Sequence, residues 1–284
     1  MAIQLITDST SYIPDHIVQA HNIAIVPLSS NFNDESFLDI PSQFTSFYEK
    51  LRSVDYIPKS SQPSVSDIYE AFERAVKKGD QVIGTFLSSK MSGTYSTACM
   101  IKEQLLEAYP EAQIQIIDSA SNCMQLGLCV LAGAKAIKEG KSFEVVLTII
   151  EATKGKTRFI FSPDTLEYLR RGGRIGTAGA FMGQLLQVKP ILTVCDGETT
   201  SLDKVRTRKK SIQYLTDTFL KDIQKRGLEN VVIHHIEALG EAEKLKKSLE
   251  DKCELENIEI VSIGPVIGTH VGPGAIGIAY EMVN

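Results

Sequence analysis

Two serine-rich segments are the parts of this 284-residue chain best suited to bind a ligand. Residues 60–64 read Ser-Ser-Gln-Pro-Ser, and residues 88–94 read Ser-Ser-Lys-Met-Ser-Gly-Thr. Hydroxyl groups, together with the backbone N–H groups of a helix that begins near Gly93, can donate hydrogen bonds to an anion. The second segment is neither a P-loop nor a nucleophile elbow, because it lacks Gly-x-x-x-x-Gly-Lys-Ser/Thr and Gly-x-Ser-x-Gly. The two segments therefore predict a receptor for a carboxylate or a phosphate, with helix capping and a structural turn as the alternatives.

Three further segments carry residues that could take part in such a site. Residues 7–10, Thr-Asp-Ser-Thr, follow the first predicted strand, where open parallel sheets bind ligands. Residues 170–174, Arg-Arg-Gly-Gly-Arg, could hold an anion or a protein partner. His270 lies between Gly268 and Gly272, which predicts an accessible ring. Each segment also has a purely structural explanation: a helix cap, cations at a helix end, or a structural histidine.

The pattern of apolar residues predicts the elements that hold these segments in place. In the first half, strands over residues 3–6, 23–28, 81–87 and 113–117 alternate with helices, one around residues 68–76 and one in which Met100, Ile101, Leu105 and Ala108 share a face. This alternation is typical of a parallel sheet covered by helices. The sequence therefore predicts an N-terminal parallel-sheet α/β domain over residues 1–157.

After residue 157 the pattern indicates a mixed, partly antiparallel sheet. A helix is expected to begin at Ser162-Pro163 and to end at Gly172-Gly173. Strands over residues 189–194 and 201–206 flank the hairpin signal Asp196-Gly197, and further strands are expected over residues 231–236, 258–263 and 276–282. Helices over residues 212–223 and 242–249 complete the second domain. The fold class is thus α/β, with a C-terminal mixed domain over residues 158–284 and the ligand site between the two domains.

Composition narrows the functional classes. The net charge of −5 disfavours nucleic acid as a partner, since phosphate-backbone binding needs a surplus of lysine and arginine. The five cysteines form no CxxC pair, and His234 and His235 are neighbours on a predicted strand and point to opposite faces. We therefore expect no metal site and no cofactor. No leader pattern and no apolar run of about 20 residues is apparent, so a cytoplasmic protein is expected.

Five of these segments, in order along the chain, resemble the successive motifs of the bacterial DegV family. They are residues 7–10, 61–64, 88–95, 168–175 and 270–274. The resemblance implies two α/β domains with a long-chain fatty acid held in a deep tunnel. It further implies the role of fatty-acid-binding subunit in a bacterial fatty acid kinase, which presents the bound carboxyl group to a separate ATP-dependent subunit. The protein would then not be catalytic alone, and the fatty acid would be its ligand.

The resemblance also implies roles for individual residues. It assigns the fatty-acid carboxylate to Ser92 and the Gly93 amide, with a hydroxyl of Ser60 or Ser61 and His270 nearby. Which serine makes the contact stays open, because the family has Thr-Ser-Gln-Pro where this chain has Ser-Ser-Gln-Pro.

Ser9 and Arg171 are expected to support the site. The basic segment 204–210, with Arg206, resembles a surface offered to the kinase subunit, and a solvated strand end is its alternative. Transient contact with a membrane surface would accompany the exchange of such a ligand.

Two rival functions are kept. The first is a stand-alone serine-dependent acyl hydrolase or transferase that uses Ser92 and His270, although the sequence offers no acidic partner for His270. The second is a binding module that reports lipid levels.

Overall fold

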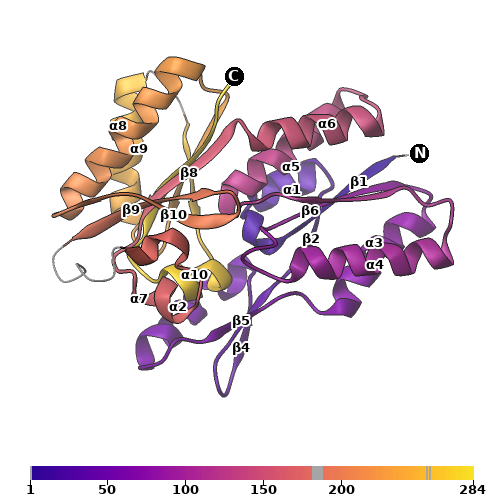
Figure 1. The fold of residues 1–284 in the computed structure, drawn as a ribbon, viewed down its shortest axis with the longest axis horizontal. Coiled ribbons are helices and arrows are strands. Elements are labelled where there is room, and N and C mark those ends of the chain that lie inside the picture. The colour runs from indigo at the N-terminus through magenta and orange to yellow at the C-terminus, as the bar shows by residue number, and fades with distance from the viewer. Residues whose placement is uncertain (1, 181–187, 254, 256) are drawn as a thin grey trace.

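Three β-sheets organise the described part of the computed structural model, which comprises residues 2–180, 188–253, 255 and 257–284 (Figure 1). The first sheet is parallel and has the strand order β2-β1-β6-β7. The second is a small antiparallel sheet with the order β4-β3-β5, and the third is a mixed sheet with the order β10-β9-β8-β13-β11-β12. The strands are β1 (Ile3–Asp8), β2 (Ala24–Val26), β3 (Ser29–Asn31), β4 (Ser36–Leu38), β5 (Lys59–Ser61), β6 (Gln81–Phe86), β7 (Ile114–Asp118), β8 (Thr157–Ser162), β9 (Lys189–Cys195), β10 (Glu198–Val205), β11 (Asn230–His235), β12 (Glu259–Ser262) and β13 (Ile276–Glu281). The predicted combination of a parallel and a mixed sheet is confirmed.

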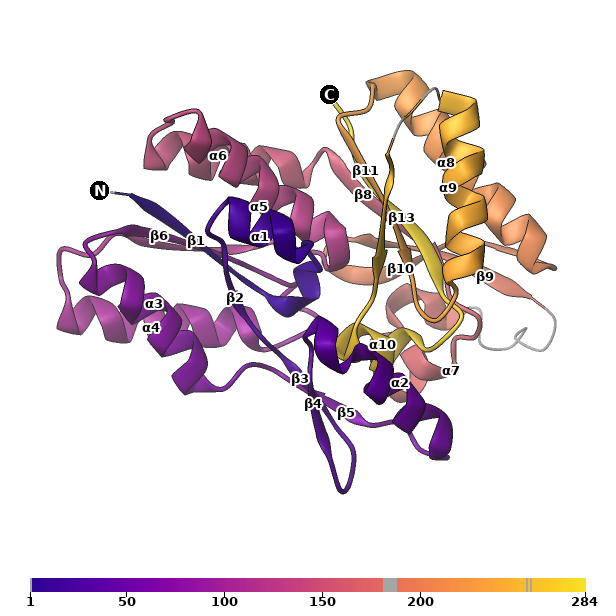
Figure 2. The ribbon, with the colours of Figure 1, turned by 180° about the vertical axis from the view of Figure 1, so that it is seen from behind.

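Helices cover the outer faces of the two large sheets and also fill the space between them (Figures 1 and 2). Helices α3 and α4 pack on one face of the parallel sheet, and α8 lies with α9 against the mixed sheet. Helix α5 contacts β1 and β6 of the parallel sheet as well as β8 and β13 of the mixed sheet. The helices are η1 (Ser9–Ser11), α1 (Asp15–Ala20), η2 (Pro41–Gln43), α2 (Phe44–Ser53), α3 (Val65–Lys77), α4 (Thr94–Ala108), α5 (Cys123–Lys138), α6 (Phe143–Lys154), α7 (Glu167–Arg171), α8 (Arg208–Arg226), α9 (Leu239–Cys253) and α10 (Pro265–Val271).

Strand alternation divides the core between these layers. In β6, Val82 joins the cluster beneath α3 and α4, whereas its neighbour Ile83 joins the central cluster around α5. In β8, Phe159 and Phe161 face the central cluster, and Ile160 faces α8 and α9. Successive side chains of a strand point to opposite faces, so each large sheet is apolar on both sides. The central layer contains the cavity described below.

The start of one predicted helix is wrong. The helix was expected to begin at Ser162-Pro163, but Ser162 is the last residue of the strand β8 and α7 covers only Glu167–Arg171. The segment Thr-Arg-Phe-Ile-Phe-Ser pairs with β13 on one side and with β9 on the other. Its β-branched and aromatic residues fit a strand that is buried on both faces, which outweighs the capping signal of Ser-Pro.

The predicted apolar face of α4 is correct at Ile101 and Leu105 and wrong at Met100 and Ala108, both of which are exposed. Ile101 and Leu105 are fully buried, whereas Met100 is 53% exposed. The buried stripe runs through Ala98, Ile101 and Leu105, so a residue directly before Ile101 points away from the sheet. The expected domain boundary at residues 157–158 coincides with the start of β8, the first strand of the mixed sheet. The division into two domains stays a prediction.

Candidate functional site

The segment after β6 forms one wall of the candidate site. Ser92 lies directly before α4, and its Oγ is 2.9 Å from Thr94 Oγ1 and accepts a bond from the Thr94 N–H. Gly93 is the N-terminal cap residue of α4. The first N–H groups of a helix have no partner within it, and the helix dipole places partial positive charge there. Half-buried Ser92 and exposed Gly93 therefore offer donors where an acceptor can reach them from solvent.

The facing wall joins a strand from the first half of the chain to a helix from the second. Ser60, in β5, has its Oγ 2.7 Å from Nε2 of His270 in α10. Ser61, the next residue of β5, is exposed. The expectation that glycines leave the His270 ring accessible is wrong, because the segment is helical and His270 is only 8% exposed. Helix α10 packs against α2, α7, β3 and β5, which buries all seven of its residues.

His270 is neutral at physiological pH. Burial lowers its pKa to about 4, and the positive charge of Arg174 contributes in the same direction. In a neutral imidazole one ring nitrogen donates and the other accepts, so the ring forms a polar pair with Ser60 without charge. Its Nδ1 has no hydrogen-bond partner and faces Gly172, where a side chain would collide with it.

Arg174 ties the two walls together. Its Nε donates to the carbonyl oxygen of Met91 at 3.1 Å, and its Nη1 donates to the carbonyl oxygen of Gly172 at 2.7 Å. Both arginines are exposed, but Arg174 lines the cavity, whereas Arg171, which was expected to support the site, lies 3.9 Å from Glu167. The sequence motif contained both arginines, and spacing alone did not distinguish the one that lines the cavity.

These residues surround one cavity with about 920 Å³ of unfilled space, its open mouth included. Ser60, Ser61, Ser92, Gly93 and His270 all line it, so the structure brings together every residue predicted to contact the carboxylate. Further in, the lining is mostly apolar and almost fully buried, and it includes Leu28, Leu87, Phe159, Phe161 and Val266. The cavity is thus polar at its exposed end and largely apolar inside.

Ser9, which was expected to support the site, lies outside the cavity lining. Its Oγ accepts a bond from the Leu28 N–H and donates to Asp39 Oδ2 at 2.9 Å. Asp39 Oδ1 in turn accepts a bond from the N–H of Val266, in the first turn of α10. Burial raises the pKa of Asp39 to about 7, despite these hydrogen bonds. Sequence reasoning missed Asp39, because a lone aspartate between Leu38 and Ile40 matches no motif.

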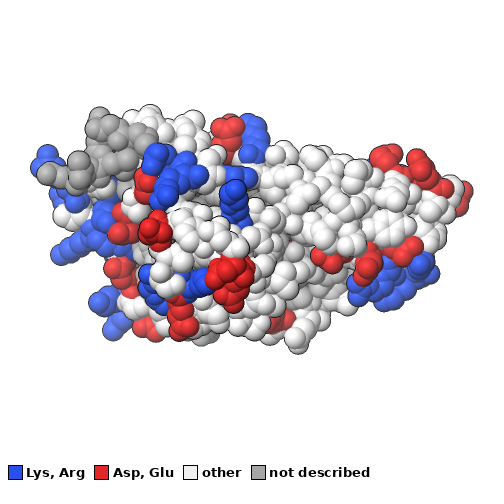
Figure 3. All heavy atoms as spheres, turned by 90° about the horizontal axis from the view of Figure 1, so that it is seen from below, with Lys and Arg blue, Asp and Glu red and all other residues white. Residues whose placement is uncertain are grey.

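The basic segment near Arg206 differs in exposure from one residue to the next. Arg206 is exposed between β10 and α8. Arg208, by contrast, is used internally, since it pairs with Glu241 at 2.6 Å and donates to the carbonyl oxygens of Ser162 and Gly274. Figure 3 views the molecule from below and shows lysines and arginines, with acidic residues among them, at the left, the side on which Figure 1 draws α8 and α9. The middle of that face carries few charges.

Comparison with known proteins identifies the family of this chain. A sequence model described as "Uncharacterised protein, DegV family COG1307" matches residues 2–283. The chain belongs to the DegV family. It is 46% identical over 280 residues to a DegV domain-containing protein of Clostridium acetobutylicum, covering 99% of this chain and 98% of the relative.

Solved structures of DegV proteins share the fold over the full length. The fatty acid binding protein DegV of Bacillus subtilis is 34% identical, with a TM-score of 0.87 and coverage of 99% of both chains. A stearic acid-binding protein of Eubacterium ventriosum is 26% identical, with a TM-score of 0.91, covering 100% of this chain and 99% of the other. These two solved relatives are described as fatty-acid-binding proteins, and the expected resemblance to the DegV family is confirmed.

The described residues add two negative findings. Among them, no three His, Cys, Asp or Glu side chains come together as a metal site would require. In the same part of the chain, no helix combines the length and the apolar character needed to cross a membrane.

Proposed function

We propose that this DegV protein holds a long-chain fatty acid in the cavity and presents its carboxylate to a separate ATP-dependent kinase subunit. The observation that carries the proposal is the polarity of the cavity, with hydrogen-bond donors at its exposed end and apolar side chains inside. An amphipathic carboxylic acid matches both ends. Fatty-acid binding by DegV proteins of 34% and 26% identity supports the same ligand class.

The energetics suit such a ligand. Burying one CH₂ group contributes about 0.8 kcal/mol, so about 15 of them contribute on the order of 12 kcal/mol before the costs of association. The carboxylate needs partners, because an unpaired charge at the edge of an apolar cavity costs several kcal/mol. Ser92 Oγ, the Gly93 N–H and a hydroxyl of Ser60 or Ser61 are the donors we assign to it. Neutral His270 adds no charge and orients Ser60 through their 2.7 Å contact.

The partner would carry out the chemical step. An oxygen of the bound carboxylate would attack the terminal phosphorus of ATP held by the kinase subunit, ADP would leave, and an acyl phosphate would form. This chain contributes the positioned carboxylate, and it lacks the P-loop motif that would hold ATP. Exposed Arg206 is the residue that we assign to the contact with the partner. Such a pair of proteins would act in the cytoplasm, where ATP is supplied.

The ligand is tested by native mass spectrometry and titration. The purified protein should carry, or take up, a fatty acid of about 16 to 18 carbons, for which the methylene arithmetic gives sufficient binding energy. Ser92→Ala should weaken fatty-acid binding about tenfold, the value of one hydrogen bond to a charged group. Ser66→Ala, on the exposed side of α3, is the matched control and should bind normally. Apo protein that takes up no added fatty acid would contradict the proposal.

The hydrolase alternative has weaker support. Ser92 pairs with Thr94 instead of His270, and the serine that does contact His270 is Ser60. In the part of the chain that the structure describes, no carboxylate bonds to the other ring nitrogen, which faces Gly172. A nucleophilic serine needs a base that is itself oriented by a third group. Ester turnover by the protein alone, with fluorophosphonate labelling of Ser60 or Ser92, would favour the hydrolase, and co-purification with a regulator in place of a kinase would favour a lipid-sensing module.

A further inference from the structure

Asn122 is an unmatched polar group in the buried wall of the cavity. The side chain lines the cavity and is 7% exposed. Among the described residues, its Oδ1 has no hydrogen-bond partner, and its Nδ2 reaches only the thioether sulfur of Met91 at 3.1 Å. Sulfur is a weak acceptor, so neither end of the amide is well satisfied. A buried polar group of this kind requires a physical explanation, because most such groups are hydrogen-bonded.

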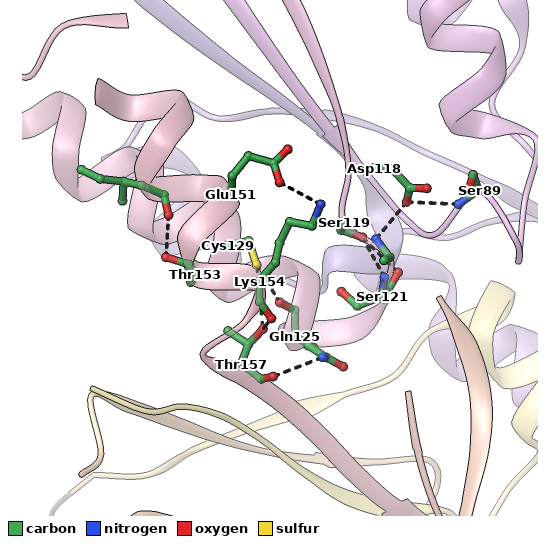
Figure 4. Close-up of polar contacts among 12 residues, drawn as sticks. Ser89, Asp118, Ser119, Ser121, Gln125, Cys129, Glu151, Thr153, Lys154 and Thr157 are labelled. Carbon is green, nitrogen blue, oxygen red and sulfur yellow. Dashed lines mark hydrogen bonds and ion pairs between the residues drawn. The ribbon is translucent and has the colours of Figure 1, made fainter. Parts of the chain in front are cut away.

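Residues 118–121, directly before Asn122, form a hydrogen-bonded turn; Figure 4 shows Asp118 with Ser89, and Ser119 with Ser121. Asp118 Oδ1 accepts bonds from the N–H groups of Ser89 and Ala120 at 3.2 and 2.8 Å. The hydroxyl of Ser119 accepts from the N–H of Ser121 and donates to its carbonyl oxygen, both at 3.1 Å. Ala120 and Cys123 both have a φ of 51°, a conformation that non-glycine residues adopt only where the surroundings enforce it.

His234, another buried polar residue that lines the cavity, is fully satisfied. His234 Nε2 accepts a bond from the Met124 N–H at 3.0 Å, and its Nδ1 bonds to the carbonyl oxygen of Val261 at 3.1 Å. The ring also packs edge-on against Phe159, with 5.5 Å between centroids. His234 therefore needs nothing from a ligand. Asn122, which directly precedes α5 and lies two residues before Met124, does.

We propose that the acyl chain bound by this protein carries a hydroxyl group at the level of Asn122. This inference rests on the proposed fatty-acid function and specifies the ligand within that class. A hydroxyl group both donates and accepts, so it pairs with the amide whichever way the Asn122 side chain is turned. An unsubstituted chain would place methylene groups against the amide and leave it unpaired in an apolar wall. The cavity is thus matched to a hydroxy fatty acid over its saturated parent.

Binding titrations with stearic acid and with a set of hydroxystearic acids test this assignment. The hydroxy acids differ only in the carbon that bears the hydroxyl, so one of them places it beside Asn122. The wild-type protein should bind that isomer about tenfold more tightly than stearic acid, as one buried hydrogen bond predicts. Asn122→Leu should lose this preference and bind stearic acid more tightly than the wild type does. The substitution removes no capping bond of α5, and a thermal melt checks that the fold is kept.

The Ser92→Ala variant serves as the matched control, because it should weaken both classes of acid by the same factor and keep the hydroxyl preference. Stearic acid that binds as tightly as every hydroxy isomer would overturn the inference and leave the fatty-acid function standing. A preference that persists in Asn122→Leu would overturn it as well. Failure of every acid to bind would instead overturn the fatty-acid function and this inference with it.

Discussion

We expect Asp39→Asn to remove the part of the pH dependence of stability that comes from ionisation of the Asp39 carboxyl. The Asp39 carboxyl is 3% exposed and accepts hydrogen bonds from Ser9 Oγ, the hydroxyl of Tyr12 and the N–H of Val266. It thereby connects the end of β1 to the first turn of α10. Asparagine has nearly the same shape and keeps one acceptor oxygen. Its side chain is neutral at every pH and therefore mimics the protonated form of the Asp39 carboxyl.

The direction of the pH effect on stability follows from the pKa of Asp39, which burial raises from 3.8 to about 7. Because the folded state holds the proton more tightly than the unfolded state, ionisation opposes folding. This penalty is absent below about pH 4, grows as the pH rises, and is complete above about pH 7. A difference of about three pKa units corresponds to on the order of 4 kcal/mol. The unfolding free energy of Asp39→Asn, relative to wild type, should therefore rise by up to that amount between about pH 4 and pH 8.

Urea unfolding followed by far-ultraviolet circular dichroism measures this difference, since the chain has no tryptophan to report by fluorescence. Asp8, His234 and His270 titrate in both proteins, so their contributions largely cancel in the comparison. Asp55→Asn, at an exposed position, is the control and should show the same difference from wild type at both pH values. If the Asp39→Asn difference also stays constant with pH, burial does not control the protonation of this carboxyl and the reasoning fails.

Two further substitutions address the mouth of the cavity and its surroundings. Gly172→Ala adds a methyl group that would collide with His270 Nδ1, so we expect a loss of about 1–3 kcal/mol in stability and weaker fatty-acid binding. Gly155→Ala, at another helix end with similar backbone angles and open space, is the control in a thermal melt and a titration; equal effects would contradict the proposed clash. Arg206→Glu should slow acyl-phosphate formation with the kinase subunit about tenfold, at unchanged fatty-acid affinity, because it reverses the charge of an exposed residue. An unaltered rate would remove Arg206 from the partner surface.

Local sequence patterns were sufficient to predict the elements whose buried face is determined by their own residues. The helices around residues 68–76, 212–223 and 242–249 are confirmed as α3, α8 and α9, because each buries a single apolar stripe. The hairpin at Asp196-Gly197 is also confirmed, since both residues have the positive φ that its turn requires. Polar segments that follow strands were recognisable as binding residues for the same local reason. Ser92 and Gly93 directly precede a long helix, and both line the cavity.

Other features depend on contacts that no local pattern contains. The strand β8 was missed because its character comes from pairing with β13, more than 100 residues later in the chain. Asn122 carries no motif and becomes notable only once the cavity beside it is known. Asp39 is significant because its partner Val266 is 227 residues away in sequence. Sequence reasoning recognised the donors of the site but not the residues that position them.

Helix α10 explains why the site could not be read from either half of the chain alone. A helix of seven residues is not stable in isolation, since nucleation costs more than so few backbone hydrogen bonds return. Residues from the first half of the chain hold it in place: the Tyr48 hydroxyl donates to the carbonyl oxygen of Ile263 just before the helix, and Ser30 Oγ bonds to Pro265 and Thr269. These contacts and the Asp39 carboxyl fix His270 against Ser60. The polar end of the cavity, which is the proposed carboxylate site, therefore forms only when the two halves dock.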